Sequence, residues 1–294
     1  MRILVLGATG YIGGASARAL HARGHTVVGL ARSDEAARRL EAAGFGVARG
    51  DMADGPSIAA AATAADGVVN AGFDPANVAT TAPTATFALL TALEGTGKPL
   101  VACGGTLIYG DTGDAIVAET DRRTPPAFVT WAPLEDAVLA ASDKGIRSVI
   151  VRSPLLYGNG GGAMLPGFIG ASRQWGVGIH IGDGTNRWSA THVDDVGSLV
   201  AAAVERAEAG SVFVPASGQT PSLQEIAASI SRLIGAEGRT QAWPVHEAAA
   251  AMGDWAYGIV LNQRFSTRAG ELLGWQPAGP SIFEDIEHGS YGAA

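Results

Sequence analysis

The sequence predicts an α/β protein in which a doubly wound parallel sheet carries a smaller C-terminal lobe. Three observations support this fold class. Short β-branched runs alternate with alanine-rich helical stretches from the start of the chain. A glycine-rich turn, GATGYIGG, directly follows the first of these runs. After residue 156, segments that contain glycine and tryptophan replace the alternation, which indicates a second structural region.

The alternating runs are expected to form apolar strands separated by helices, which is typical of a parallel sheet covered on both faces. Because crossovers between parallel strands are right-handed, the sheet should be doubly wound. Strands are expected at 2–7, 25–32, 45–51, 67–72, 99–105 and 147–153. Helices are expected at 13–24, with Gly24 just past the helix end, at 34–44, between the fourth and fifth strands, and at 194–207.

Composition and charge exclude several classes of protein. Of the 294 residues, 47% are hydrophobic and 16% are charged, which fits a globular protein. A net charge of -8 argues against a nucleic-acid partner. No apolar run approaches the roughly 20 residues that span a bilayer, so no membrane partner is expected. The single cysteine, Cys103, cannot form an internal disulfide, and a cytoplasmic location is predicted.

The turn GATGYIGG has the features of a phosphate-binding site. Gly7 permits the tight turn, Gly10 lets backbone N–H groups approach a pyrophosphate, and Gly13 lets helix and strand pack closely. The spacing Gly-x-x-Gly-x-x-Gly differs from the standard fingerprint, so a purely structural turn is the alternative. Its place between the first strand and the first helix favours dinucleotide binding. The remaining members expected to line the site are Thr9, Tyr11 and Ile12.

The end of the second predicted strand indicates which dinucleotide binds. An NAD site normally presents an acid there to the ribose 2′-hydroxyl. Arg32 and Ser33 stand in that place, and no acid occurs before Asp34. Arg32 can bind a 2′-phosphate with two hydrogen bonds, and Ser33 can add a hydroxyl. NADP(H) is therefore the predicted cofactor, and a solvated surface role for Arg32 is the alternative.

Several motifs occur in a fixed order: GATGYIGG, GDMAD at 50–54, TLIYGD at 106–111, RSPLLYGNGGG at 152–162 and THVDDV at 191–196. With this order the chain resembles the extended or atypical short-chain dehydrogenase/reductase superfamily, in its NAD-dependent epimerase/dehydratase branch. The resemblance implies a Rossmann-type domain that binds NAD(P) and a lobe that closes over the substrate. It also implies that the cofactor is contacted by Asp51, Met52, Ala71, Gly72, Ser153, Pro154 and Leu155.

This reading divides the chain into two regions. Residues 1–155 are expected to form the dinucleotide-binding domain, and residues 156–294 mainly the substrate-binding lobe. Residues 190–215 are expected to return to the first domain. THVDDV gathers a histidine and two aspartates, but Asp at the start of a helix serves as a cap and dipole partner, so no metal site is predicted.

The catalytic side chains that the resemblance implies are missing. The family places Ser or Thr four residues before the Tyr of a Tyr-Gly pair, and a Tyr-x-x-x-Lys dyad some 25 residues later. Here Gly105 stands at the first place, with Thr106 beside it, and Trp131 and Glu135 stand at the dyad. Indole has no acidic proton near neutral pH and can only donate a hydrogen bond.

Three side chains remain as candidates for the missing chemistry. Thr106 could hydrogen-bond the substrate, Tyr109 could act as an acid, and Glu135 could bind a ribose hydroxyl or titrate in a closed cleft. Trp131 is expected to form a wall beside the nicotinamide. Further tryptophans in the predicted lobe suggest a wide apolar pocket for a small apolar or aromatic substrate.

The leading hypothesis is an NADP(H)-dependent oxidoreductase that reduces an apolar carbonyl or imine without the usual Tyr-Lys dyad. One alternative is an epimerase or dehydratase that recycles its cofactor. The other is a non-catalytic NADP(H)-binding redox sensor. A homodimer is left open.

Overall fold

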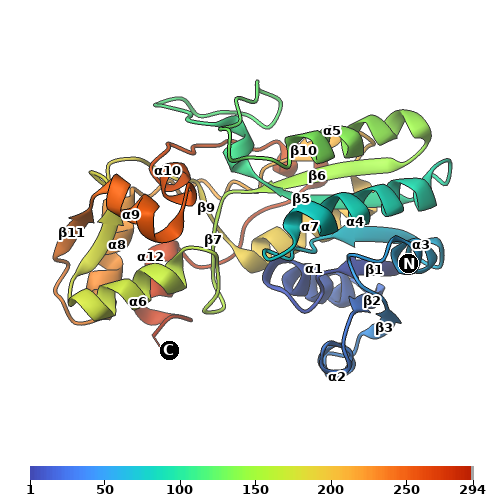
Figure 1. The fold of residues 1–294 in the computed structure, drawn as a ribbon, viewed down its shortest axis with the longest axis horizontal. Helices are drawn as coiled ribbons and strands as arrows, with labels where there is room; N and C mark the ends of the chain where they lie inside the picture. Colours follow the sequence, from blue (N-terminus) through green and yellow to red (C-terminus); the bar gives the residue numbers. More distant parts are fainter. Residues whose placement is uncertain (293–294) are drawn as a thin grey trace.

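The computed structural model describes residues 1–292, which form a sheet-centred part and a smaller lobe beside it (Figure 1). The sheet has seven strands in the order β10-β6-β5-β4-β1-β2-β3, all paired in parallel. The order reverses direction between β1 and β4, as in a doubly wound sheet. The predicted fold class is confirmed. The strands are β1 (Arg2–Leu6), β2 (Thr26–Ala31), β3 (Gly46–Arg49), β4 (Gly67–Asn70), β5 (Pro99–Gly105), β6 (Arg147–Ser153) and β10 (Ser211–Phe213).

Alternating side chains of the strands build one core on each face of the sheet. Ile3 and Val5 of β1 join the core that contains α1 (Tyr11–Ala22), α2 (Asp34–Ala42) and α7 (Val193–Arg206). Leu4 and Leu6 join the opposite core. The helices of that second face are α3 (Gly55–Thr63), α4 (Val78–Leu93) and α5 (Ala132–Ala140).

Two segments from the second half of the chain pack on the sheet-centred part. β10 forms one edge of the sheet and pairs with β6, with Ser211 opposite Val149, and α7 lies against α1. α7 and β10 lie within residues 190–215, the stretch that was expected to return to the first domain. The second segment was not predicted from the sequence; in it, α11 (Ala269–Leu273) joins the core that contains α7. There Trp275 donates its indole N–H to the Asp195 carbonyl oxygen (3.1 Å).

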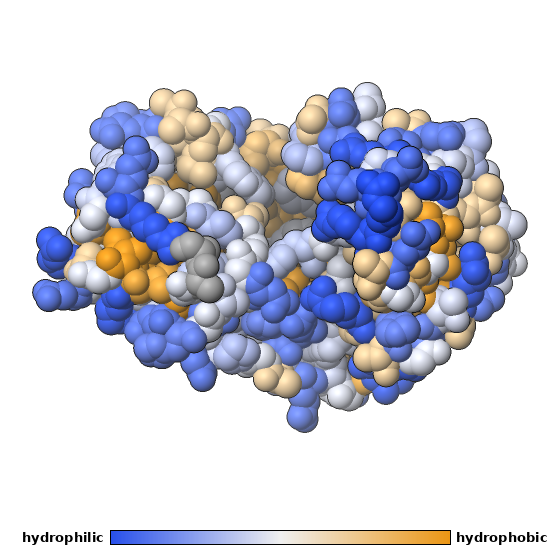
Figure 2. All heavy atoms as spheres, turned by 90° about the horizontal axis from the view of Figure 1, so that it is seen from below, coloured by the Kyte–Doolittle hydropathy of each residue, from blue (hydrophilic) through white to orange (hydrophobic). Residues whose placement is uncertain are grey.

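The smaller lobe has a core of its own, separate from the two cores of the sheet. Two pairs of parallel strands, β7 with β9 and β8 with β11, support its helices. These elements are β7 (Leu155–Tyr157), α6 (Leu165–Trp175), β8 (Gly178–Ile181), β9 (Ala190–His192), α8 (Leu223–Leu233), β11 (Thr240–Trp243), α9 (Val245–Met252), α10 (Trp255–Ile259) and α12 (Ile282–His288). The surface is hollowed between the lobe and the sheet-centred part (Figure 2).

Two short 3-10 helices, η1 (Thr106–Tyr109) and η2 (Ala141–Lys144), complete the sheet-centred part. Within residues 1–292, no helix is long and apolar enough to cross a membrane. The same residues contain no cluster of three or more histidine, cysteine or acidic side chains that could hold a metal ion.

Candidate active site

A cleft of about 940 Å³ lies along the carboxyl ends of the sheet strands and extends under the lobe. Residues that directly follow or end the strands line it, including Gly7 after β1, Arg32 after β2, Ala71 after β4, and Gly105 in β5. Ligands of open α/β sheets bind at this edge because the loops there converge where the strand order reverses. Trp188 and other lobe residues close the far end.

The glycine turn forms one end of the cleft. Gly7 has φ +77°, and a Cβ there would lie 2.4 Å from the Ala71 carbonyl oxygen, so only glycine fits. A Cβ on Gly13 would lie 2.1 Å from the Gly7 carbonyl oxygen, which shows how closely α1 approaches β1. α1 begins at Tyr11, two residues before its predicted start, and directs its N-terminal N–H groups to this end. Such a terminus favours an anion such as pyrophosphate.

Of the predicted turn residues, those that line the cleft are Gly7, Thr9, Gly10, Tyr11 and Ile12. Gly13 lies beneath the turn, where it allows the close packing of helix and strand. Tyr11 also donates its hydroxyl to the Gly158 carbonyl oxygen (2.8 Å), which ties the turn to the loop that follows β7. Burial raises the pKa of this hydroxyl well above its usual range, so Tyr11 acts as a neutral donor.

Arg32 lies at the adenine end of the predicted coenzyme path. Its side chain is 68% exposed, and Nη1 lies 3.6 Å from the nearest carboxylate oxygen of Asp74. Ser33 does not line the cleft, and its hydroxyl caps α2 by accepting from the Ala36 N–H (3.1 Å). Asp51, which follows β3 and is expected to contact the coenzyme, also lines the cleft.

Sequence reasoning missed a second cation beside the turn. Arg39 reaches across from α2 and donates to the Thr9 carbonyl oxygen (3.0 Å). Met52 and Ala71 line the cleft, and Met52 lies so close to Gly72 that a Cβ on the glycine would meet the sulfur at 2.6 Å. The contact of Arg39 depends on how α2 packs, so no local motif reveals it.

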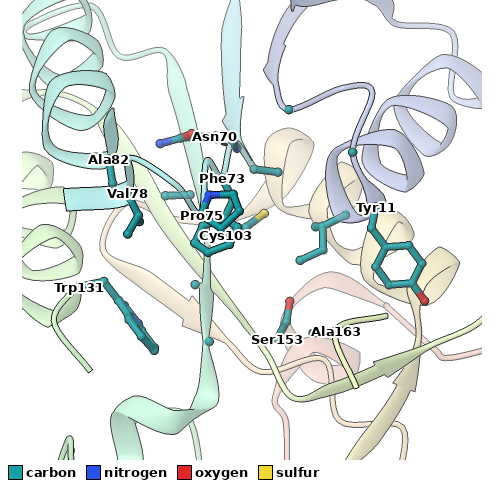
Figure 3. A pocket seen from close by; sticks show the side chains of 18 of the residues that line it. Tyr11, Asn70, Phe73, Pro75, Val78, Ala82, Cys103, Trp131, Ser153 and Ala163 are labelled. Carbon is teal, nitrogen blue, oxygen red and sulfur yellow. Dashed lines mark hydrogen bonds between the residues drawn. The ribbon is translucent and has the colours of Figure 1, made fainter. Parts of the chain in front are cut away.

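Four buried polar atoms without hydrogen-bond partners come from residues that line the other end of the cleft, called here the reaction end. They are Thr106 Oγ1, Trp131 Nε1, Glu135 Oε1 and Ser153 Oγ. Figure 3 shows Trp131 on one wall and Ser153 near the floor of this region. Buried polar atoms are nearly always paired in folded proteins. Four such atoms on residues that line one cleft are therefore consistent with a ligand site.

Glu135 forms a buried ion pair that sequence reasoning did not anticipate. Arg152 of β6, which is 2% exposed, donates from Nε to Glu135 Oε2 (2.7 Å). Burial raises the pKa of the Glu135 carboxyl, and the Arg152 guanidinium acts against that rise. The net shift of the pKa is upward, and the hydrogen bond from Arg152 to Oε2 leaves Oε1 as the carboxyl oxygen without a partner.

Tyr109 does not line the cleft. Its hydroxyl donates to the Glu119 carbonyl oxygen (2.7 Å) and accepts from Arg152 Nη1. Burial raises the pKa of this phenol. The structure therefore brings Thr106, Trp131 and Glu135 together at the cleft and places Tyr109 behind them, in contact with Arg152.

The rest of the reaction end is apolar. Trp188 and Trp255 line the cleft, whereas Trp175 and Trp243 pack against each other with ring centroids 5.8 Å apart. Cys103 also lines it, and burial raises the pKa of its thiol to about 12. The other apolar lining residues include Leu107, Leu134, Pro154, Leu155, Met164 and Ile259.

These features fit a dinucleotide coenzyme. The turn and helix terminus suit a pyrophosphate, and the orphaned polar atoms suit the nicotinamide nucleoside and a substrate. A doubly wound sheet with such a cleft defines a Rossmann-type nucleotide-binding protein. The model of the NAD dependent epimerase/dehydratase family matches residues 3–214. The chain belongs to this family.

Three comparisons describe its relatives. An uncharacterised protein of Saccharomyces cerevisiae is 31% identical over 97% of this chain and 98% of its own length. The 2-alkyl-3-oxoalkanoate reductase of Stenotrophomonas maltophilia is 27% identical over 80% of this chain and 76% of its own length. The solved dTDP-glucose 4,6-dehydratase of Streptomyces venezuelae, with NAD bound, has a TM-score of 0.82 at 19% identity, covering 100% of this chain and 96% of the other. Relatives with reductase and with dehydratase names therefore share this fold.

Proposed function

We propose that the protein is an NADP(H)-dependent reductase of an uncharged, apolar carbonyl or imine compound. The observation that carries the proposal is the reaction end itself, where hydrogen-bonding atoms without partners are surrounded by an apolar wall. The likeness to the Stenotrophomonas maltophilia reductase supports a reductive reaction.

The charges along the cleft support this substrate class. Of its lining residues, one is cationic, Arg32, and three are acidic, Asp51, Asp74 and Glu135. Arg32, Asp51 and Asp74 follow β2, β3 and β4, at the adenine end. A phosphorylated or carboxylated substrate at the reaction end would have no lining cation to neutralise it, and a buried unpaired anion is costly. A neutral substrate avoids this cost.

The side chains at the reaction end can orient a carbonyl group. The coenzyme supplies the hydride in this chemistry. Thr106 Oγ1 and Ser153 Oγ are hydroxyls that can each donate a hydrogen bond to a substrate oxygen. Trp131 adds an N–H donor and a flat apolar wall. The proton that the oxygen receives passes through a hydroxyl such as Thr106 or comes from water, because indole is not acidic and Glu135 is paired with Arg152.

The preference for NADP(H) is supported by Arg32, which lines the cleft at the adenine end. Arg32 is free to move onto a 2′-phosphate, since its contact with Asp74 is long and exposed. We expect NADPH to bind at least ~10-fold more tightly than NADH, in line with the ~1.5–3 kcal/mol of a charge-assisted hydrogen bond. Arg32→Ala should remove most of this difference in calorimetric titration. Arg38→Ala, which changes an exposed arginine of α2 outside the cleft, is the matched control.

Consumption of NADPH with a panel of ketones, aldehydes and cyclic imines tests the reaction. A reductase consumes coenzyme with uncharged, apolar members of the panel and not with phosphorylated sugars. A recycling epimerase or dehydratase, which the family name also covers, would copurify with coenzyme and show no net consumption. A redox sensor would bind both coenzyme forms with different affinities and turn over nothing. Either of the last two results would overturn the proposal.

A further inference from the structure

Arg152, Gly104 and Tyr109 form a framework around the carboxylate of Glu135. Arg152 holds Oε2, so Oε1 is the oxygen left without a partner. Arg152 also donates from Nη1 to the Tyr109 hydroxyl, and the guanidinium carbon lies 5.0 Å from the centre of the phenol ring. The phenol is anchored by its hydrogen bond to the Glu119 carbonyl oxygen. Arg152, itself held by Tyr109, therefore restrains the carboxylate at Oε2.

Gly104 leaves the space that Oε1 occupies. A Cβ at this position would lie 2.1 Å from Glu135 Oε1 and 3.1 Å from Cδ. Real atoms do not approach this closely, so any larger residue at 104 would displace the carboxylate. Gly104 and Glu135 both line the cleft, and Oε1 is buried beside them.

We infer that Arg152 is a positioning residue that holds Glu135 so that Oε1 accepts a hydrogen bond from the nicotinamide nucleoside half of the bound coenzyme. This inference rests on the coenzyme site of the proposed function but not on the substrate or on the reaction. A carboxylate oxygen can only accept, and the ribose hydroxyls of that half are donors. The arrangement places an anion, neutralised by a buried arginine, where the resemblance led us to expect a lysine.

The first experiment compares a whole coenzyme with a fragment that lacks the nicotinamide nucleoside. Dissociation constants of NADPH and of adenosine 2′,5′-bisphosphate are measured by calorimetry for the wild type and for Glu135→Gln. The substitution should weaken NADPH by about 10-fold or more, because a hydrogen bond to a charged group is lost, and should change the fragment by less than about twofold. NADH and ADP are titrated in parallel. The comparison of coenzyme with fragment can then still be made if the protein does not prefer NADPH to NADH.

Asp136→Asn is the matched control, since this neighbouring acid pairs with Arg123 and does not line the cleft. It should leave the ratio of the two dissociation constants unchanged. If Glu135→Gln weakens coenzyme and fragment equally, or weakens neither, the inference is wrong. Neither result would bear on whether the protein is a reductase.

The second experiment fills the space that Gly104 leaves for Oε1 and keeps the carboxylate of Glu135. In Gly104→Ala the added methyl must displace Oε1, so the affinity ratio should fall as in Glu135→Gln. The two changes act on one contact, so adding Gly104→Ala to Glu135→Gln should alter the ratio by less than about twofold. Full additivity would overturn the inference, because it would mean that glycine and glutamate act independently.

The third experiment tests Arg152 through pH. The ionised carboxylate is the acceptor, so the coenzyme-to-fragment affinity ratio should fall as pH drops through the pKa of Glu135. Burial raises this pKa, Arg152 and Arg123 lower it, and Asp136 raises it. Removing the guanidinium in Arg152→Met should therefore move the fall to higher pH, and Arg152→Lys should move it less.

An unchanged pH profile in Arg152→Met would show that Arg152 does not act through the carboxylate. Removing one partner of a buried ion pair is strongly destabilising, so thermal unfolding is measured for each variant. If Arg152→Met does not fold, the Arg152→Lys profile decides the point, because it must still lie at higher pH than that of the wild type.

Discussion

The two ends of the cleft are built in different ways. At the turn end, the walls are mainly backbone from one short stretch, and Gly7 and Gly13 are needed because a Cβ would strike main-chain atoms. At the reaction end, the walls are side chains from η1, α5, β6 and the lobe, and their polar atoms lack partners. Coenzyme binding thus depends on local sterics, whereas the chemistry depends on contacts between distant segments.

Gly13→Ala should have the largest effect on coenzyme binding at the turn end. The new methyl would lie 2.1 Å from the Gly7 carbonyl oxygen, and neither β1 nor α1 can move without disturbing the sheet. We expect calorimetry to detect no coenzyme binding, with a lower melting temperature. Gly14→Ala is the matched control on the same helix, because its Cβ would meet its nearest atom at 3.4 Å. Similar binding by the two variants would contradict the steric account.

The reactivity of the Cys103 thiol tests whether its surroundings at the reaction end raise its pKa. Burial raises the pKa of Cys103 from 9.0 to about 12. At pH 8 the thiolate fraction should therefore be roughly 10³-fold lower than in the unfolded chain. Alkylation by iodoacetamide, followed by mass spectrometry, should be slower in the native protein by about that factor. Rapid labelling of the native protein would mean that the pKa of this partly exposed thiol is not raised.

The hydroxyl of Thr106 tests whether a side chain at the reaction end contributes to catalysis, and its removal should have a smaller effect than the changes above. Thr106→Val removes the hydroxyl with little change of volume. If the hydroxyl contacts the reacting oxygen, kcat should fall by ~10² without loss of coenzyme affinity. Thr81→Val is the control, since the Thr81 hydroxyl only bonds the Asn77 carbonyl oxygen within α4 (3.0 Å). Steady-state assay with unchanged kcat in Thr106→Val would remove this hydroxyl from the mechanism.

The reaction end also explains why the familiar dyad cannot simply be restored. A lysine at position 135 would place a second cation beside the buried guanidinium of Arg152, where Glu135 now neutralises it. Two buried like charges repel strongly in a medium of low polarity. The pair therefore has to be changed together, which ties Glu135 to Arg152 across 17 residues of sequence.

Local patterns were enough to predict six of the seven strands of the main sheet and helices α1, α2, α4 and α7, whereas β10 and α3 were not predicted. The apolar runs fall on β1 to β6, and the helix that contains Val196 and Leu199 packs on the sheet, because hydrophobic periodicity is set by neighbouring residues. The boundaries were less certain, as the earlier start of α1 shows. The packing of α11 against α7 was not predicted, since no local pattern specifies which surface a short helix covers.

The sequence by itself determined the fold class, the glycine turn and the absence of the usual dyad, because each is a property of one contiguous stretch. Only the tertiary structure decided that Glu135 faces Arg152, that Gly104 makes room for its carboxylate, and that Tyr109 stands behind the cleft. It also decided which tryptophans line the cleft. The physical reason is that these contacts join residues far apart in the chain, and their side-chain directions follow from how the strands and helices pack.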